Sequence, residues 1–135
     1  MSNEPVVSHP IALEWLAPTC ELAIVRLDPR APEPRWLDGW SFVSVTRTDR
    51  ELSIIAPIDA VPAGVRREGP YVAARVRGEL PCTLVGVFTR ILGPLAAAGI
   101  PILALSTFET DYVLVRSADR ERAEAAWRGA GIECR

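Results

Sequence analysis

The sequence contains no lysine and only one histidine, and these shortages exclude most common catalytic devices. All fifteen positive charges of the 135-residue chain are arginines. A Schiff-base lysine and a phosphate-loop lysine are therefore excluded. The single histidine, His9, lies in a polar N-terminal segment, and any Ser-His-Asp or Cys-His nucleophile would have to be built on it. No GxGxxG or phosphate-loop pattern occurs either. The sequence thus predicts a protein without catalytic residues and without a cofactor.

Cysteine is also scarce, and its spacing argues against both disulfides and metal sites. The three cysteines, Cys20, Cys82 and Cys134, are odd in number and far apart in the sequence. This pattern favours reduced thiols in a cytosolic protein, and it lacks the grouped spacing of a metal site. Cys82 precedes a predicted helix, where a thiolate would be stabilised. The commoner role of such a residue is that of a small, half-buried side chain.

Long apolar runs and an excess of positive charge are missing as well. No run approaches the ~20 apolar residues that span a bilayer, and the first residues lack a signal-peptide core. The net charge of −2 provides no basic surface for nucleic acid. We therefore expect a cytoplasmic protein that binds neither membranes nor nucleic acid.

The stretch 83–116 is the most informative part of the chain, because it predicts a helix followed by a hairpin. Thr83 is suited to cap the helix, and Gly99 fits the left-handed position after its last turn. The segments Ile102–Phe108 and Tyr112–Val115 are short apolar strands around a polar tip. The helix is predicted from an apolar stripe of helical period, which is formed by Leu84, Val87, Phe88, Ile91, Leu92 and Leu95.

The order of the remaining elements predicts an α+β protein with two ferredoxin-like βαββαβ modules, antiparallel sheets and helices on one face. In the N-terminal module the helical connections have shrunk to turns, so we interpret that module as degenerate. We expect a tail at 1–19, the degenerate module at 20–68 and the complete module at 69–135. Residues 11–16 fit either a strand or one helical turn. The other predicted elements are strands at Glu21–Leu27, Phe42–Thr48, Leu52–Ala56, Tyr71–Arg77 and Ile132–Cys134, and a helix from Asp119.

A small-molecule site is conceivable where the predicted helix begins. The backbone N–H groups of its first turn, Leu84–Val87, lack intrahelical partners, and Gly86 leaves them unshielded for a carboxylate. Asp111, at the hairpin tip, is expected at the same edge of the sheet. An anion receiver beside a carboxylate suits a free amino acid, which carries both charges. The alternative is structural: Thr83 caps the helix, Gly86 permits packing and Asp111 begins a turn.

Two segments also resemble a known family. The strings GVFTRILGPLAAAGIPILALSTFETDYVLV (86–115) and FVSVTRTDRELSIIAP (42–57) are similar to tandem ACT-domain proteins. Within that family they most resemble the bacterial ACT_7-type proteins and the eukaryotic cytosolic arginine sensors of the CASTOR kind. The resemblance implies a non-catalytic regulatory protein that senses a small effector, an amino acid. It further implies a homodimer formed by side-by-side packing of the C-terminal modules, and a regulated protein partner.

The resemblance also implies a ligand site between two modules. The sequence departs from the family's pattern at Leu84, where the arginine-sensing relatives carry an acidic residue that helps to hold the guanidinium. Leu84 offers no counter-charge to a guanidinium, so a small or apolar amino acid fits better than arginine. The implied ligand-binding residues are Cys82, Thr83, Leu84, Val85, Gly86, Val87, Pro101, Ile102, Thr107, Phe108, Thr110 and Asp111.

A ligand-free structural or protein-interaction module of the same fold is the alternative. In that case Trp15, Trp36 and Trp40 would serve as partner anchors, although tryptophans at such positions are more often core residues. The two interpretations differ in whether the region around Gly86 and Asp111 is open or filled by side chains.

Overall fold

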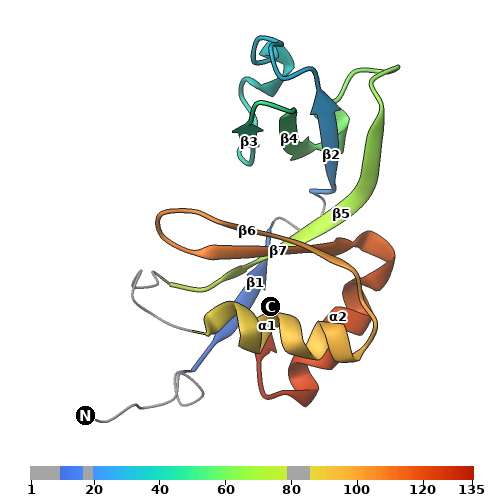
Figure 1. Ribbon diagram of the computed structural model, residues 1–135. Helices are drawn as coiled ribbons and strands as arrows, with labels where there is room; N and C mark the ends of the chain where they lie inside the picture. Colours follow the sequence, from blue (N-terminus) through green and yellow to red (C-terminus); the bar gives the residue numbers. More distant parts are fainter. Residues whose placement is uncertain (1–9, 17–19, 79–85) are drawn as a thin grey trace, which may run out of the picture. The chain divides into compact units, whose positions relative to one another are not determined.

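The structure is a computed structural model that describes residues 10–16, 20–78 and 86–135 (Figure 1). The chain divides into two compact units. The larger unit combines the chain up to residue 18 with residues 72–135, and the smaller unit comprises residues 19–71. Strand β5, Arg67–Val76, contributes its first residues to the smaller unit and the rest to the larger one. The domain boundary predicted between residues 68 and 69 falls within this strand.

The larger unit has the βαββαβ order predicted from the sequence. After β5 come helix α1, the hairpin β6–β7, helix α2 and the short strand β8. In its sheet β6 pairs with β7, β7 with β5, β5 with β1 and β1 with β8. The 3-10 helix η4 (Ser117–Asp119) leads into α2. The bounds of the other elements are β1 Ala12–Trp15, α1 Val87–Ala97, β6 Ile102–Ser106, β7 Asp111–Arg116, α2 Arg120–Gly129 and β8 Glu133–Cys134.

The two helices of the larger unit share one apolar core with one face of its sheet. Alternate strand residues, such as Leu13, Val113 and Val115, point into this core and are fully or almost fully buried. From the helices, Ile91 and Trp127 fill the same core, both with no exposed surface. The helical stripe and the apolar strands predicted from the sequence therefore meet in one cluster, and the predicted α+β fold class is confirmed.

Strand β1 corrects the prediction of an N-terminal tail at 1–19. Its residues pair antiparallel with β5 and parallel with β8, so β1 is inserted between the first and last strands of the βαββαβ unit. The parallel β1–β8 pair makes the sheet mixed instead of purely antiparallel. Opposite each other in the register, Glu14 and Arg75 form an ion pair at 2.6 Å. On the other side, the Trp15 indole donates a hydrogen bond to Glu124 of α2 at 2.6 Å. These contacts hold β1 in the larger unit.

The smaller unit has the strand order β3-β4-β2-β5, with every pair antiparallel. This is the order of a ferredoxin-like sheet. Among its described residues the helices are only the 3-10 turns η2 (Arg35–Leu37) and η3 (Ile58–Ala60), in agreement with the predicted loss of helical connections. The strands are β2 Leu22–Leu27, β3 Ser44–Arg47 and β4 Leu52–Pro57. A separate core lies on one face of this sheet and includes Val25, Ile54 and Leu37.

The start of α1 differs from the prediction. The helix begins at Val87, and Gly86 precedes it in a left-handed conformation with φ +79°. A residue in that conformation does not belong to a right-handed helix, so Gly86 lies before α1 and not inside its first turn, and the predicted cap Thr83 lies outside the described residues. The end of α1 agrees with the prediction, since Gly99 has φ +72°.

The predicted tryptophan positions have different environments. Trp15 is half-buried, with its ring centroid 5.7 Å from that of Trp127, and Arg120 lies over its face at 4.9 Å. Trp36 packs against the core of the smaller unit. Trp40 is 43% exposed and donates to the Trp36 carbonyl. Two of the three are therefore structural, and only Trp40 offers substantial exposed surface.

Candidate functional site

The tip of the β6–β7 hairpin is a tight, internally bonded turn. The Thr107 amide donates to the Thr110 carbonyl at 2.8 Å, and the Thr107 hydroxyl bonds to the same carbonyl. At the base of the turn the Ser106 hydroxyl donates to Asp111 Oδ1 at 2.7 Å. The Asp111 carboxylate is therefore held in place and is half-buried. A second carboxylate oxygen is available for a ligand cation, because a carboxylate accepts several hydrogen bonds.

The hairpin tip is tied to the end of strand β5. The Thr110 hydroxyl donates to the carbonyl of Val76, the last residue of β5, at 2.9 Å. The next described element after β5 is α1, whose first residue is Val87. The end of β5, the start of α1 and the hairpin tip are on the same side of the larger unit in Figure 1. The topology thus places Asp111 at the edge where the helix begins, as the sequence predicted.

The first turn of α1 has features that favour an anion. The first backbone hydrogen bond of the helix runs from the Arg90 amide to the Gly86 carbonyl at 3.1 Å. The amides of Val87, Phe88 and Thr89 precede that bond, and the N-cap residue supplies no side-chain hydrogen bond. The first turn also contains no acidic residue. The positive end of the helix dipole is therefore not neutralised from within α1.

Other predicted site residues lie elsewhere or have different surroundings. Pro101 and Ile102 are at the start of β6, at the opposite end of the hairpin from Thr107, and one chain does not bring them to Asp111. Val87 is buried in the core, so only its backbone can face a ligand. Phe108 is 86% exposed on the tip. The predicted residues Cys82, Thr83, Leu84 and Val85 lie outside the described residues.

Sequence reasoning missed Ser106, which orients Asp111. Ser106 and Asp111 are directly opposite in the register of the hairpin. The predicted strand Ile102–Phe108 ran past the actual end of β6, so the turn appeared to begin later than it does. Knowledge of the turn length would have paired these two residues, because a hairpin turn fixes the register of its strands.

Cys134 has a chemically suppressed thiol. Burial, and to a smaller extent the nearby Glu124 carboxylate, raise the pKa of Cys134 to about 12, with Arg120 partly opposing the shift. The pKa of Cys20 is also raised, by burial and by Asp59. A thiol with a raised pKa has little thiolate at neutral pH, and the thiolate is the reactive form. Neither cysteine is therefore suited to nucleophilic chemistry.

We expect iodoacetamide at pH 8 to alkylate Cys134 at least about a hundredfold more slowly in the native protein than in urea, because the native thiolate fraction is far smaller. Peptide mass spectrometry after timed quenching measures both rates. The pKa of Cys134 in the folded protein lies above its ordinary value of 9.0, so this thiol also makes the protein less stable as the pH rises from about 9 to 12. Equal alkylation rates in native and unfolded protein would contradict the raised pKa of Cys134.

The described residues contain no group of three or more His, Cys, Asp and Glu side chains that could hold a metal ion. In the same residues, no helix combines the length and the apolar character needed to cross a membrane.

Comparison with known proteins identifies the family. The ACT_7 family model, an ACT domain, matches residues 67–127, and a second model, of an N-terminal domain, matches residues 21–64. Among solved structures, protein Atu0741 from Agrobacterium tumefaciens is 36% identical, with 93% of this chain and 92% of that chain covered and a TM-score of 0.85. None of the curated proteins matches this sequence.

Two more distant structures share the fold. Protein VC0802 from Vibrio cholerae, of unknown function and described as a possible transport protein, is 14% identical over 93% of this chain and 91% of that chain, with a TM-score of 0.73. The regulatory subunit of aspartate kinase from Thermus thermophilus, in its ligand-free form, is 11% identical, with 86% of this chain and 96% of that chain covered and a TM-score of 0.60. From the family models, the identity to Atu0741 and the βαββαβ order of the larger unit, we conclude that this chain belongs to the ACT-domain family.

Proposed function

We propose that this ACT-domain protein is a non-catalytic regulatory sensor that binds a small amino acid at the edge formed by the start of α1 and the β6–β7 hairpin tip. The proposal rests on two groups at this edge that would bind ligand groups of opposite charge. The free amides of the first turn of α1 suit a carboxylate, and the fixed Asp111 carboxylate suits an ammonium group. An α-amino acid provides both groups.

A second copy of the chain would complete the site. Pro101 and Ile102 lie at the far end of the hairpin within one chain. Side-by-side pairing of two larger units in a homodimer would bring these residues of one copy to the helix start of the other. The apolar Ile102 would then contact the ligand side chain, which supports a small or apolar amino acid over a charged one.

The exposed Phe108 supports a second function, that of a protein-interaction module. A phenylalanine that is 86% exposed on a rigid turn is unusual, since large apolar side chains are normally buried. Aromatic side chains of this kind often anchor protein partners. In this case no small ligand binds, and the hairpin tip itself is the recognition element.

Thermal-shift measurements with the twenty amino acids test the proposed site. A ligand at about ten times its Kd stabilises the native state by about 1.4 kcal/mol, which raises the Tm by several degrees. We expect one chemical group of amino acids to give this shift, and we expect Asp111→Ala to abolish it. Glu109→Ala is the matched control, because Glu109 is an exposed carboxylate on the same tip. No shift with any amino acid at tens of millimolar would reject the sensor in favour of the interaction module.

A further inference from the structure

The sheet of the smaller unit has two chemically different faces. Along the central strand β2, Val25 points into the core, and its neighbours Ile24 and Arg26 point to the opposite face. Strand β4 behaves in the same way, with Ile54 inside and Ser53 outside. The core residues of the smaller unit belong to the inner face only. The outer face therefore exposes polar side chains around the half-buried Ile24.

A hollow of about 360 Å³ lies on this outer face. This volume falls in the range of small-molecule sites. Its lining combines an apolar residue, a hydroxyl and charges of both signs, and the side chains concerned are Ile24, Arg26, Glu51, Ser53, Arg66 and Glu68. Arg67 also lines the hollow, but its guanidinium donates to the carbonyls of residues 61, 62 and 65. Of the other charged side chains, Arg26 and Glu51 pair with each other, and Arg66 and Glu68 complete the set.

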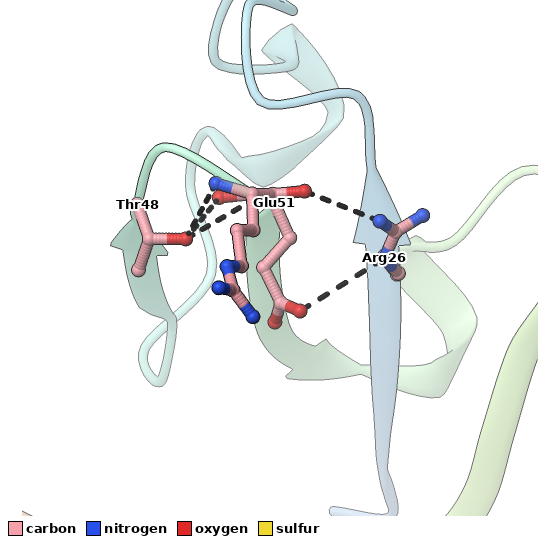
Figure 2. Close-up of polar contacts among 4 residues, drawn as sticks. Arg26, Thr48 and Glu51 are labelled. Carbon is pink, nitrogen blue, oxygen red and sulfur yellow. Dashed lines mark hydrogen bonds and ion pairs between the residues drawn. The ribbon is translucent and has the colours of Figure 1, made fainter.

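Figure 2 shows how the turn between β3 and β4 holds Arg26. The Thr48 hydroxyl accepts hydrogen bonds from the amides of Arg50 and Glu51 at 3.1 and 3.2 Å, and this closes the turn. Arg26 donates to the Arg50 carbonyl at 3.1 Å, and its Nε lies 3.8 Å from the Glu51 carboxylate. The bond to the Arg50 carbonyl uses one of the five N–H donors of the guanidinium, and the contact with Glu51 is an ion pair that is too long for a hydrogen bond. The remaining donors stay on a side chain that is 69% exposed.

Besides Arg67, two arginines and two glutamates line the hollow, and one of the glutamates, Glu51, is already paired with Arg26. Val25 is opposite Arg67 and Ile24 is opposite Glu68 in the register, and Arg66 immediately precedes β5 and lines the same hollow as Arg26. Arg26 and Arg66 carry like charges, and an anion bound between them reduces their repulsion. Glu68 lies two residues from Arg66, which corresponds to about 6.6 Å along a strand.

We propose that this hollow is a second binding site, specific for a short ω-amino acid. The ligand carboxylate binds between Arg26 and Arg66, and its terminal ammonium binds Glu68. The methylene chain lies over Ile24. In an α-amino acid the two charged groups are attached to one carbon and cannot span this separation. The site lies wholly within the smaller unit and is independent of the site proposed at α1.

The test is calorimetric titration of the full-length chain with a series of amino acids of increasing length. The series contains glycine, 3-aminopropanoate, 4-aminobutanoate, 5-aminopentanoate and 6-aminohexanoate, with acetate and butylamine as singly charged probes. We expect the tightest binding for 4-aminobutanoate or 5-aminopentanoate. Arg66→Gln and Glu68→Gln should each weaken that binding about tenfold or more, because each removes a charged hydrogen-bond partner.

Controls separate this site from the rest of the protein. Arg35→Gln and Glu33→Gln change exposed charges of the smaller unit that do not line the hollow, and both should leave binding unchanged. Asp111→Ala should also leave it unchanged, since that variant tests the other unit. Circular dichroism confirms that each variant is folded. No binding by any member of the series would overturn the proposal, and so would equal binding of acetate, loss of binding in Asp111→Ala, or full binding by Arg66→Gln and Glu68→Gln.

Discussion

Replacing Trp127 with alanine should lower the free energy of unfolding of the larger unit by about 3–5 kcal/mol. Trp127 has no exposed surface and packs in the core between the two helices and the sheet. Its indole N–H donates to the Ile91 carbonyl at 2.9 Å, and its ring lies 5.7 Å from that of Trp15. The substitution removes the largest fully buried side chain and leaves a cavity, together with a lost hydrogen bond.

Urea denaturation followed by circular dichroism measures this loss. Small domains are typically stable by only about 5–15 kcal/mol, so Trp127→Ala should be largely unfolded at moderate urea concentration. Phe108→Ala is the matched control, since an aromatic side chain that is 86% exposed should change the stability by no more than about 0.5 kcal/mol. A loss below about 1.5 kcal/mol in Trp127→Ala would show that the core can collapse around the missing indole.

The second large effect is expected at Gly69, where alanine should destabilise the smaller unit by about 1–3 kcal/mol. Gly69 has φ +143°, a conformation that side-chain-bearing residues rarely adopt. A Cβ atom there would lie 2.8 Å from the Leu22 carbonyl oxygen and 3.4 Å from the Ala23 Cα. Both neighbours are main-chain atoms of β2, so the pairing of β2 with β5 would have to shift. The register between these strands is already irregular at this point, as in a β-bulge.

Hydrogen–deuterium exchange localises this effect, because the β2 amides should exchange faster in Gly69→Ala. Gly93→Ala provides a control of opposite sign. Gly93 lies inside α1, and nothing is within 4 Å of the position of its Cβ. Alanine there should stabilise the protein by about 0.5–1 kcal/mol, since it reduces the entropy lost on folding. If Gly69→Ala were as stable as Gly93→Ala, the close approach of Gly69 to β2 would be wrong.

The order of strands and helices could be predicted because it depends on local patterns. The helical stripe through Ile91 and Leu95 and the short apolar runs 102–108 and 112–115 each indicate one type of element, and these elements are present. The same holds for the smaller unit, where three prolines in 28–35 and the short segment 58–65 excluded long helices. The fold class followed from these elements, and the family from the resemblance of segments 42–57 and 86–115 to ACT-domain proteins.

The limits of prediction are clearest at α1 and at the hairpin. Gly86 was expected inside the first turn of the helix, but its positive φ places it just before that turn. Glycine adopts either conformation, so sequence alone does not distinguish them. Likewise, Asp111 was predicted as a ligand group, but the hydroxyl that holds it became evident only from the hairpin register.

By itself the sequence determined the type and order of most helices and strands, the apolar stripe of α1, and the absence of a lysine-based or histidine-rich catalytic apparatus. These properties follow from side-chain chemistry and short-range periodicity. Only the tertiary structure decided that β1 lies between β5 and β8, and that Arg26 and Arg66 share one hollow with Glu68. The physical reason is that backbone hydrogen bonds between strands do not depend on residue type. Pairing partners distant in the chain are therefore not encoded in any local pattern.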